Sequence, residues 1–140
     1  MTEPENLTEK AEERAQKLTS AADIVAERLK ADVLLFNGDF YAQTAADEMV
    51  IDACMSTPRR DNVLLILVTN GGDANIAYRV ARCLQRSYRD FYVLVPGWCK
   101  SAGTLVAIGA DEIVMGEHGQ LGPWTYSSAS RTKYLNLLLA

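Results

Sequence analysis

The sequence predicts an α/β domain with a mostly parallel β-sheet of repeated strand–helix units, preceded by an N-terminal helix. Short apolar runs alternate with helical segments after residue 31, and this alternation is typical of parallel sheets with right-handed crossovers. The run Val63–Thr69 is almost wholly apolar and rich in branched residues, which indicates a strand buried on both faces. Residues 1–30 instead lack glycine and are rich in Ala and Glu. We therefore expect a helix over residues 1–30 and an α/β domain over residues 31–140.

An apolar stripe runs along the predicted N-terminal helix. Its members recur at steps of three and four residues, a spacing that lines one face of a helix: Leu7, Ala11, Ala15, Leu18, Ala22, Val25 and Leu29. The small alanines suit close packing against a neighbour. That neighbour is either the chain's own domain or another subunit of a homo-oligomer, and the pattern leaves both open.

The α/β part is expected to alternate strands and helices in chain order. Strands are predicted over residues 33–36, 63–69, 91–95 and 112–115, and helices over residues 45–55, 74–87 and 101–110. Turn residues separate these segments, as at Asn37-Gly38 and Pro96-Gly97. Asp73, just before the second of these helices, is expected to be a helix cap or a turn residue.

The composition excludes several classes of function. A chain of 140 residues with 49% hydrophobic residues suits one globular domain. Its net charge of −4 argues against nucleic-acid binding, because no excess of Lys and Arg is available for phosphate groups. The N-terminus lacks the apolar core of a secretory signal, and the longest uncharged runs, about ten residues, are too short to span a bilayer. We expect a soluble, cytoplasmic protein without a transmembrane segment.

Cysteine and histidine are too few for common metal sites. Cys54, Cys83 and Cys99 show no C-x-x-C spacing, and His118 is the single histidine. This pattern argues against a disulfide framework and against a zinc site. The sequence therefore predicts no metal and no cofactor.

Two loops that carry candidate reactive groups follow successive strands. Gly71-Gly72 comes after the strand at 63–69, and Ser101 follows the strand at 91–95, at or near the first turn of a helix. Because one helix joins these strands, they should lie parallel, with both carboxyl ends at one edge of the sheet, where ligands bind in open α/β folds. Glycine allows close approach to backbone amides, and amides at a helix start favour negative charge. A serine beside such amides suits acyl transfer, in which the amides stabilise an oxyanion.

Each feature also has a structural interpretation. A serine before Ala102-Gly103 is commonly a helix N-cap, and a Gly-Gly pair after a strand is commonly a turn. The segment is not a G-x-S-x-G elbow, because Gly97 lies four residues before Ser101. Residues 70–73 also lack the G-x-G-x-x-G fingerprint of dinucleotide-binding folds. Spacing alone therefore leaves the structural and catalytic roles open.

A family resemblance is carried by four blocks within about two thirds of the chain. The blocks are Val68–Gly72, Lys100–Leu105, Ala110–Met115 and Leu121–Pro123. In their order and spacing, the chain resembles the Clp protease proteolytic subunit of the ClpP/crotonase-like superfamily, and especially the serine dehydrogenase proteinase and signal peptide peptidase A families. The resemblance implies a Clp-protease/crotonase-like fold and a serine endopeptidase-like hydrolase that acts on peptides or proteins. It further implies that Ser101 is the nucleophile, and that amides of Ala102 and of Gly71 or Gly72 form the oxyanion hole.

The resemblance does not assign the general base to a single residue. In the Clp subunits a histidine follows the serine, and on that pattern its position falls near Pro123, beyond His118. The signal peptide peptidases use a Ser–Lys dyad instead, which makes Lys133 the first candidate and His118 the second. Lysine can serve as a base where burial lowers its pKa. Lys100, adjacent to Ser101, is expected to be exposed or to bind a substrate carbonyl.

Two other functions remain as alternatives. The apolar stretch 135–140 suggests a domain that is C-terminally incomplete or covered by a partner, which fits a catalytically inactive assembly or scaffold protein. A crotonase-like acyl-CoA enzyme would use a similar pair of amides. The serine at the nucleophile position and the lack of a basic patch for the CoA phosphates argue against it.

Overall fold

Four parallel strands form the main sheet. The computed structural model of the chain describes residues 3–56 and 59–123. Strands β1 (Ala31–Asn37), β2 (Asn62–Val68), β3 (Phe91–Val95) and β5 (Glu112–Met115) lie in the order β1-β2-β3-β5, and each neighbouring pair is parallel. The predicted α/β fold with a mostly parallel sheet is therefore confirmed.

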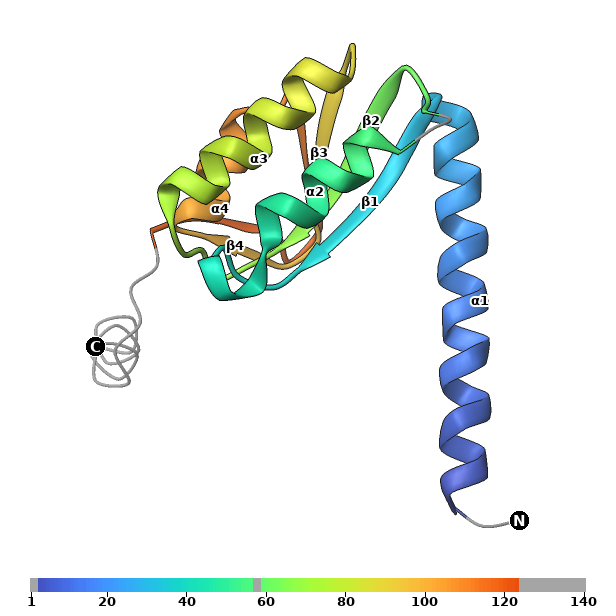
Figure 1. The fold of residues 1–140 in the computed structure, drawn as a ribbon. Coiled ribbons are helices and arrows are strands. Elements are labelled where there is room, and N and C mark those ends of the chain that lie inside the picture. Colours follow the sequence, from blue (N-terminus) through green and yellow to red (C-terminus); the bar gives the residue numbers. More distant parts are fainter. Residues whose placement is uncertain (1–2, 57–58, 124–140) are drawn as a thin grey trace, which may run out of the picture.

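Helices cover one face of this sheet and enclose the core against it (Figure 1). They are the short 3-10 helix η1 (Ala42–Thr44) and the α-helices α2 (Ala46–Met55), α3 (Ala74–Ser87) and α4 (Ala102–Ile108), with α3 in contact with both α2 and α4. The largest fully buried side chains come from both layers: Phe40, Val63, Leu65, Leu67, Val80, Leu84, Phe91, Val93, Val95 and Val106. Burial of this apolar surface is the main stabilising contribution to the domain.

The predicted elements of the domain are confirmed, with ends that differ by one or two residues. The first strand begins at Ala31 instead of Val33, and α4 ends at Ile108 instead of residue 110. Asp73 caps α3, one of its two predicted roles, because its Oδ1 atom accepts hydrogen bonds from the amides of Asn75 and Ile76 at 2.7 Å and 3.4 Å.

A second, two-stranded sheet is absent from the sequence-based prediction. Strands β4 (Trp98–Lys100) and β6 (Gln120–Gly122) pair in parallel next to the carboxyl ends of β2 and β3. Both are three residues long and mix apolar with polar residues, so neither produces a readable alternation. This small sheet holds the segment that leads into Ser101.

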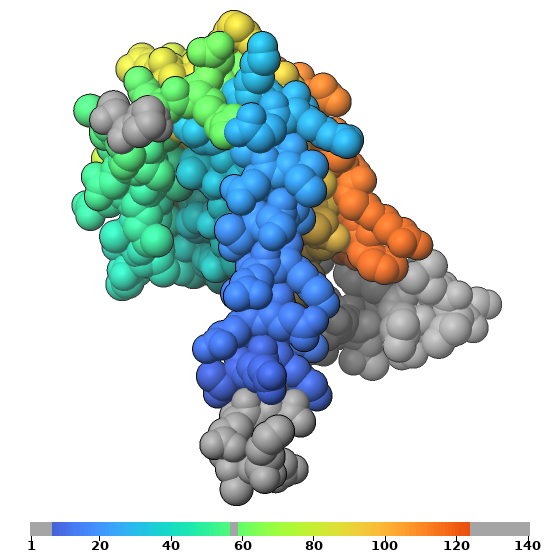
Figure 2. Space-filling view, turned by 90° about the vertical axis from the view of Figure 1, so that its right-hand side faces the viewer, coloured from blue at the N-terminus to red at the C-terminus, as the bar shows by residue number. Residues whose placement is uncertain are grey.

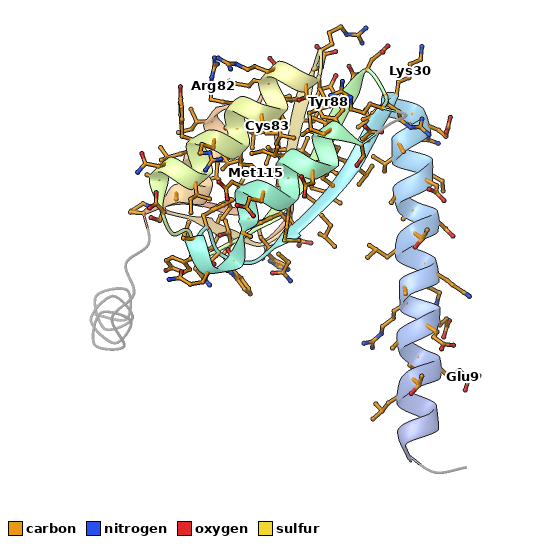
Figure 3. The ribbon with its side chains drawn as sticks, viewed as in Figure 1. Glu9, Lys30, Arg82, Cys83, Tyr88 and Met115 are labelled. Carbon is orange, nitrogen blue, oxygen red and sulfur yellow. The ribbon has the colours of Figure 1, made fainter. Side chains whose placement is uncertain are left out.

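Helix α1 (Glu3–Leu29) stands apart from the domain along most of its length and meets it near the start of β1 (Figure 1). Its described N-terminal end extends beyond the domain (Figure 2). Residues 7–21 of this helix, called the arm below, are exposed on every side. Leu7 and Leu18 of the apolar stripe are 70% and 56% exposed. Figure 3 shows Glu9 near the free end, well away from the side chains of the domain. None of the described helices is long and apolar enough to cross a membrane.

Polar side chains of the domain clamp the end of α1. Arg60 Nη1 donates to the carbonyl oxygen of Ala26 at 3.2 Å, and Asn62 Nδ2 donates to that of Leu29 at 2.8 Å. Arg60 also pairs with Glu27 at 2.5 Å. These donors satisfy carbonyl groups that a helix leaves without partners in its last turn. The direction in which α1 leaves the domain is therefore fixed by named contacts.

Candidate active site

The glycine turn (residues 70–73) joins β2 to α3 at the carboxyl edge of the sheet. Gly71 and Gly72 have φ values of +114° and +128°, which residues with a side chain rarely adopt. A Cβ atom at Gly72 would overlap the backbone of Phe40, with which Gly72 forms a parallel bridge. Both positions therefore require glycine.

Gly71 packs directly against residues 100–102, called the serine segment below. A Cβ atom added at Gly71 would lie 2.5 Å from Ser101 Cβ, 2.8 Å from the carbonyl oxygen of Lys100 and 3.1 Å from the amide nitrogen of Ala102. The structure thus brings together two loops that are separated by a helix and a strand in the sequence. They meet because β2 and β3 are adjacent and parallel.

Ser101 has a strained backbone, and its side chain forms no hydrogen bond with the described residues. Its φ is 51° and its ψ is −122°, a combination that costs a non-glycine residue about 1–3 kcal/mol. Ser101 N donates to the carbonyl oxygen of Gly122 at 2.8 Å, so β6 helps to hold this conformation. Although Ser101 occupies the N-cap position of α4, its side chain makes no capping hydrogen bond, and the residue is exposed. The N-cap interpretation of Ser101 therefore does not account for its geometry.

The amide groups of the glycine turn are engaged, with one exception. Three donate within the described residues: Asn70 N to Asp39 Oδ1 at 2.8 Å, Gly71 N to Thr69 Oγ1 at 2.9 Å, and Asp73 N to the Phe40 carbonyl oxygen at 2.6 Å. The N–H of Gly72 has no hydrogen-bond partner among residues 3–56 and 59–123, and the N–H of Ala102 likewise has none there. In this conformation Thr69 already accepts the hydrogen of the Gly71 amide. The assignment of an oxyanion-hole amide to Gly71 or Gly72 stays a prediction.

Two residues that the sequence-based reasoning did not single out support the turn. Thr69 is 1% exposed, and its backbone is bonded to β4 through Trp98 O and Lys100 N at 3.1 Å and 3.0 Å. Asp39 lies after β1, about thirty residues away in sequence, and its carboxylate reaches Asn70. A local sequence pattern carries no signal for contacts across such a separation.

The described residues do not supply a base bonded to the serine. His118 is exposed in the turn between β5 and β6, and no hydrogen bond links it to Ser101 Oγ. Lys100 is half-buried in β4. Lys133 lies outside the described residues, as does the apolar stretch 135–140. The role of each candidate base therefore stays a prediction.

Cys99 lies beneath the serine segment and is fully buried. Burial raises the pKa of its thiol to about 11, although the nearby charge of Lys100 acts in the opposite direction. Since the thiolate is the nucleophilic form, this cysteine is held in its unreactive state near neutral pH. In the part of the chain that the structure describes, no group of three or more potential ligands could hold a metal ion.

Comparison with known proteins gives one family and several relatives. A family model described as ClpP-like SDH-type serine proteinase matches residues 38–129. The uncharacterized proteins MJ0137 and MJ1495 of Methanocaldococcus jannaschii are 36% and 33% identical to the chain over 76 residues, which is 54% of this chain. The matched region spans 27% and 26% of the lengths of these two relatives.

A solved structure shares the fold. The 1510-N membrane-bound stomatin-specific protease, solved as a mutant in complex with a substrate peptide, aligns with a TM-score of 0.52 and 24% identity. The alignment covers 74% of this chain and 54% of the protease chain. The similarity in fold agrees with the parallel sheet and the position of its helices.

Proposed function

The chain belongs to the family of ClpP-like SDH-type serine proteinases, and on this premise we propose that it cleaves peptide bonds through an acyl-enzyme on Ser101. The observation that carries the proposal is the setting of Ser101. An exposed serine with a strained backbone lies in contact with Gly71, and two N–H groups without partners among the described residues, at Gly72 and Ala102, belong to the two segments that meet there.

The proposed reaction runs in two halves. Ser101 Oγ attacks the carbonyl carbon of the scissile bond while its proton passes to a general base, and the N–H groups of Gly72 and Ala102 stabilise the negative oxygen. The C–N bond then breaks, and the amine leaves with the proton from the base. Water, deprotonated by the same base, attacks the acyl carbon and releases a carboxylic acid product and the free serine hydroxyl.

The substrate in this proposal is an extended peptide or protein segment. Its main chain would pair with an exposed strand edge beside Ser101, since backbone hydrogen bonds bind a peptide independently of its sequence. Trp98, which is 53% exposed in β4, is available to contact a substrate side chain. We place the protein in the cytoplasm, in keeping with free cysteines and no disulfide among the described residues.

The decisive experiment is labelling with a fluorophosphonate probe, which transfers its phosphonyl group to an activated serine and releases fluoride. We expect the wild-type chain to be labelled and Ser101→Ala to show no labelling. Ser56→Ala is the matched control, because the Ser56 hydroxyl donates to the Asp52 carbonyl oxygen at the end of α2. Absence of labelling in the wild type would refute the catalytic proposal and leave the family assignment intact.

The same assay assigns the base. Lys133 is our first choice and His118 our second, so Lys133→Ala should abolish labelling while His118→Ala should retain it. A base with an apparent pKa near neutrality would also make the labelling rate rise with pH through that value. Retained labelling in both variants would exclude both residues.

A second candidate function is a non-catalytic subunit of an assembly. The observation that favours it is that no base is bonded to Ser101 among the described residues, while the arm leaves an apolar stripe uncovered. In this case the protein would form a homo-oligomer without reacting with the probe. Mass measurement in solution, combined with labelling, separates an oligomeric enzyme from an oligomeric scaffold, and a monomer would contradict the oligomer in both.

A further inference from the structure

We infer that Thr69, held by Asp39, is a positioning residue that decides which glycine of the turn supplies an oxyanion-hole amide. The inference rests on the proposed function, because it concerns the same site. It goes beyond that function by assigning a task to two side chains that lie next to the site and take no part in the proposed chemistry.

The first step is the hydrogen bond between Thr69 Oγ1 and the N–H of Gly71, at 2.9 Å. An amide that is already bonded to a hydroxyl oxygen cannot also point at a substrate oxygen with good geometry. Thr69 therefore removes Gly71 from the set of available donors. The next amide along the chain, at Gly72, is left as the free donor of the turn among the described residues.

The second step is the fixing of Thr69 itself. Its hydroxyl lies 3.4 Å from Asp39 Oδ1 and 3.5 Å from the Gly71 carbonyl oxygen, either of which can accept its proton. Asp39 Oδ1 also accepts the N–H of Asn70 at 2.8 Å. A carboxylate that binds both the residue before the turn and the first residue in it limits how the turn can rotate. A hydrogen bond to a charged group is stronger than one between neutral groups, which adds to this restraint.

The third step connects the turn to the serine. The Cγ2 methyl group of Thr69 packs so closely on Gly103 in α4 that a Cβ atom at Gly103 would overlap it. The backbone of Thr69 pairs with β4 on both sides, at Trp98 O and Lys100 N. One residue thus contacts the glycine turn, the strand that leads to Ser101 and the helix that follows it. The hydroxyl engages the Gly71 amide and so leaves the Gly72 amide as the free donor, whereas the methyl group packs against α4.

Acyl transfer requires an accurately placed oxyanion-hole donor, which explains why the turn would need these restraints. Removing one oxyanion-hole donor typically slows acyl transfer by about 100- to 1000-fold, and the donor must lie within a few tenths of an ångström of its place. A turn with two consecutive glycines is the least restrained type of backbone, because glycine has the widest choice of φ and ψ. Side chains outside the turn must therefore supply the rigidity that the glycines lack.

The test uses two variants, each of which removes one group of the Thr69 side chain. Thr69→Val keeps the methyl group against Gly103 and removes the hydroxyl, whereas Thr69→Ser keeps the hydroxyl and removes the methyl group. We expect Thr69→Val to slow the maximal rate of labelling of Ser101 by the fluorophosphonate by about 10- to 100-fold, because a donor is misplaced without being deleted. The half-saturating probe concentration should stay unchanged, and Thr69→Ser should retain most of the rate.

Asp39→Ala and Thr19→Val complete the set. Asp39 is half-buried, so its replacement tests the same network without opening the core, and it should lower the labelling rate in the same direction. Thr19 lies in the arm, and its hydroxyl bonds to the carbonyl oxygen of Ala15 at 2.9 Å, which makes Thr19→Val a matched control that should change nothing. Wild-type rates in Thr69→Val and Asp39→Ala, or a Thr69→Ser variant as slow as Thr69→Val, would overturn the inference.

Amide hydrogen exchange separates this inference from the proposed function. The N–H of Gly71 should exchange slowly in the wild type and in Thr69→Ser, and much faster in Thr69→Val, whether or not Ser101 is reactive. Fast exchange of Gly71 in the wild type would overturn the inference even if labelling succeeds. Slow exchange that depends on the hydroxyl, in a wild type without labelling, would support the positioning by Thr69 while refuting the catalysis.

Discussion

The glycine turn and the arm of α1 are opposite kinds of structure within one chain. Among the described residues, each N–H group of the turn but that of Gly72 has a hydrogen-bond acceptor. The neighbouring residues Thr69 and Cys99 are 1% and 0% exposed. The arm has no buried residue over fifteen consecutive positions, residues 7–21. The turn is held by contacts between distant parts of the sequence, whereas the arm is held by hydrogen bonds within its own helix.

This difference predicts where a substitution disturbs neighbouring atoms and where it does not. In the turn, a single added carbon atom meets backbone atoms that cannot move aside without moving the serine. In the arm, a side chain can be shortened and only water takes its place. A helix of this kind draws most of its stability from whatever covers its apolar face, and propensity alone makes such a segment marginal. Three predictions test this contrast.

The largest effect on the labelling of Ser101 is expected from Gly71→Ala. The new Cβ atom would lie 2.5 Å from Ser101 Cβ and 2.8 Å from the Lys100 carbonyl oxygen, and the residue would have to keep a φ of +114°. We expect labelling of Ser101 to fall by more than about 100-fold, comparable with the loss of an oxyanion-hole donor. The free energy of unfolding should fall by about 1–3 kcal/mol, as measured by urea denaturation.

Gly38→Ala is the matched control for this variant. Gly38 also follows a strand of the sheet, but a Cβ atom there has nothing within 4 Å. Labelling and stability should both stay near the wild-type values. If Gly71→Ala were labelled as fast as Gly38→Ala, the close contact between the turn and Ser101 would not exist in solution.

Shortening one leucine in each region should change the free energy of unfolding by very different amounts. Leu67 in β2 is fully buried, so Leu67→Ala should lower the free energy of unfolding by about 2–5 kcal/mol. Leu18 in the arm is 56% exposed, and Leu18→Ala should change it by less than about 0.5 kcal/mol. Urea denaturation at two protein concentrations measures both.

The concentration dependence decides what covers the stripe. A large effect of Leu18→Ala that grows with protein concentration would mean that another copy of the chain packs on the arm. A large effect at every concentration would mean that the arm folds back on its own domain. Either result would contradict the exposed arm, and each would choose one of the two neighbours that the sequence leaves open.

The sequence predicts the parts of the site that depend on local pattern. The apolar run before Gly71 and the βαβ connection are enough to predict that Gly71 and Ser101 lie at one edge of the sheet. Local pattern does not predict strands β4 and β6, because three residues are too few for a period. It also does not show that Asp39 reaches Asn70 across the sheet edge. The proposed choice between Gly71 and Gly72 as donor depends on the hydrogen bond from the Gly71 amide to Thr69 Oγ1, so it requires the structure.

The arm shows that local sequence pattern also does not predict what a helix packs against. The spacing of Leu7, Ala11, Leu18 and their neighbours correctly predicts a helix, since periodicity is a property of the segment itself. What the apolar face touches is a property of the whole molecule. Within residues 3–56 and 59–123, only the last turns of α1 contact the domain, for example through the hydrogen bond from Arg60 to the Ala26 carbonyl oxygen.

The smallest effect is expected where the arm meets the domain, at the ion pair between Glu27 and Arg60. The hydrogen bond from Arg60, followed by the attraction of its charge, holds the pKa of the Glu27 carboxyl below its ordinary value of 4.5. A lowered pKa in the folded state means that the pair stabilises the protein above the ordinary pKa and that this contribution is lost as the pH falls through the lowered value. Both side chains are open to solvent, so salt should weaken the pair.

Titration of the Glu27 carboxyl by NMR measures this pair directly. In Arg60→Ala the pKa of Glu27 should rise toward 4.5, and in the wild type the difference should shrink as the salt concentration increases. An unchanged Glu27 pKa in Arg60→Ala would mean that the clamp does not form in solution. The direction of α1 would then depend on the hydrogen bonds to the carbonyl oxygens of its last turn, without the ion pair.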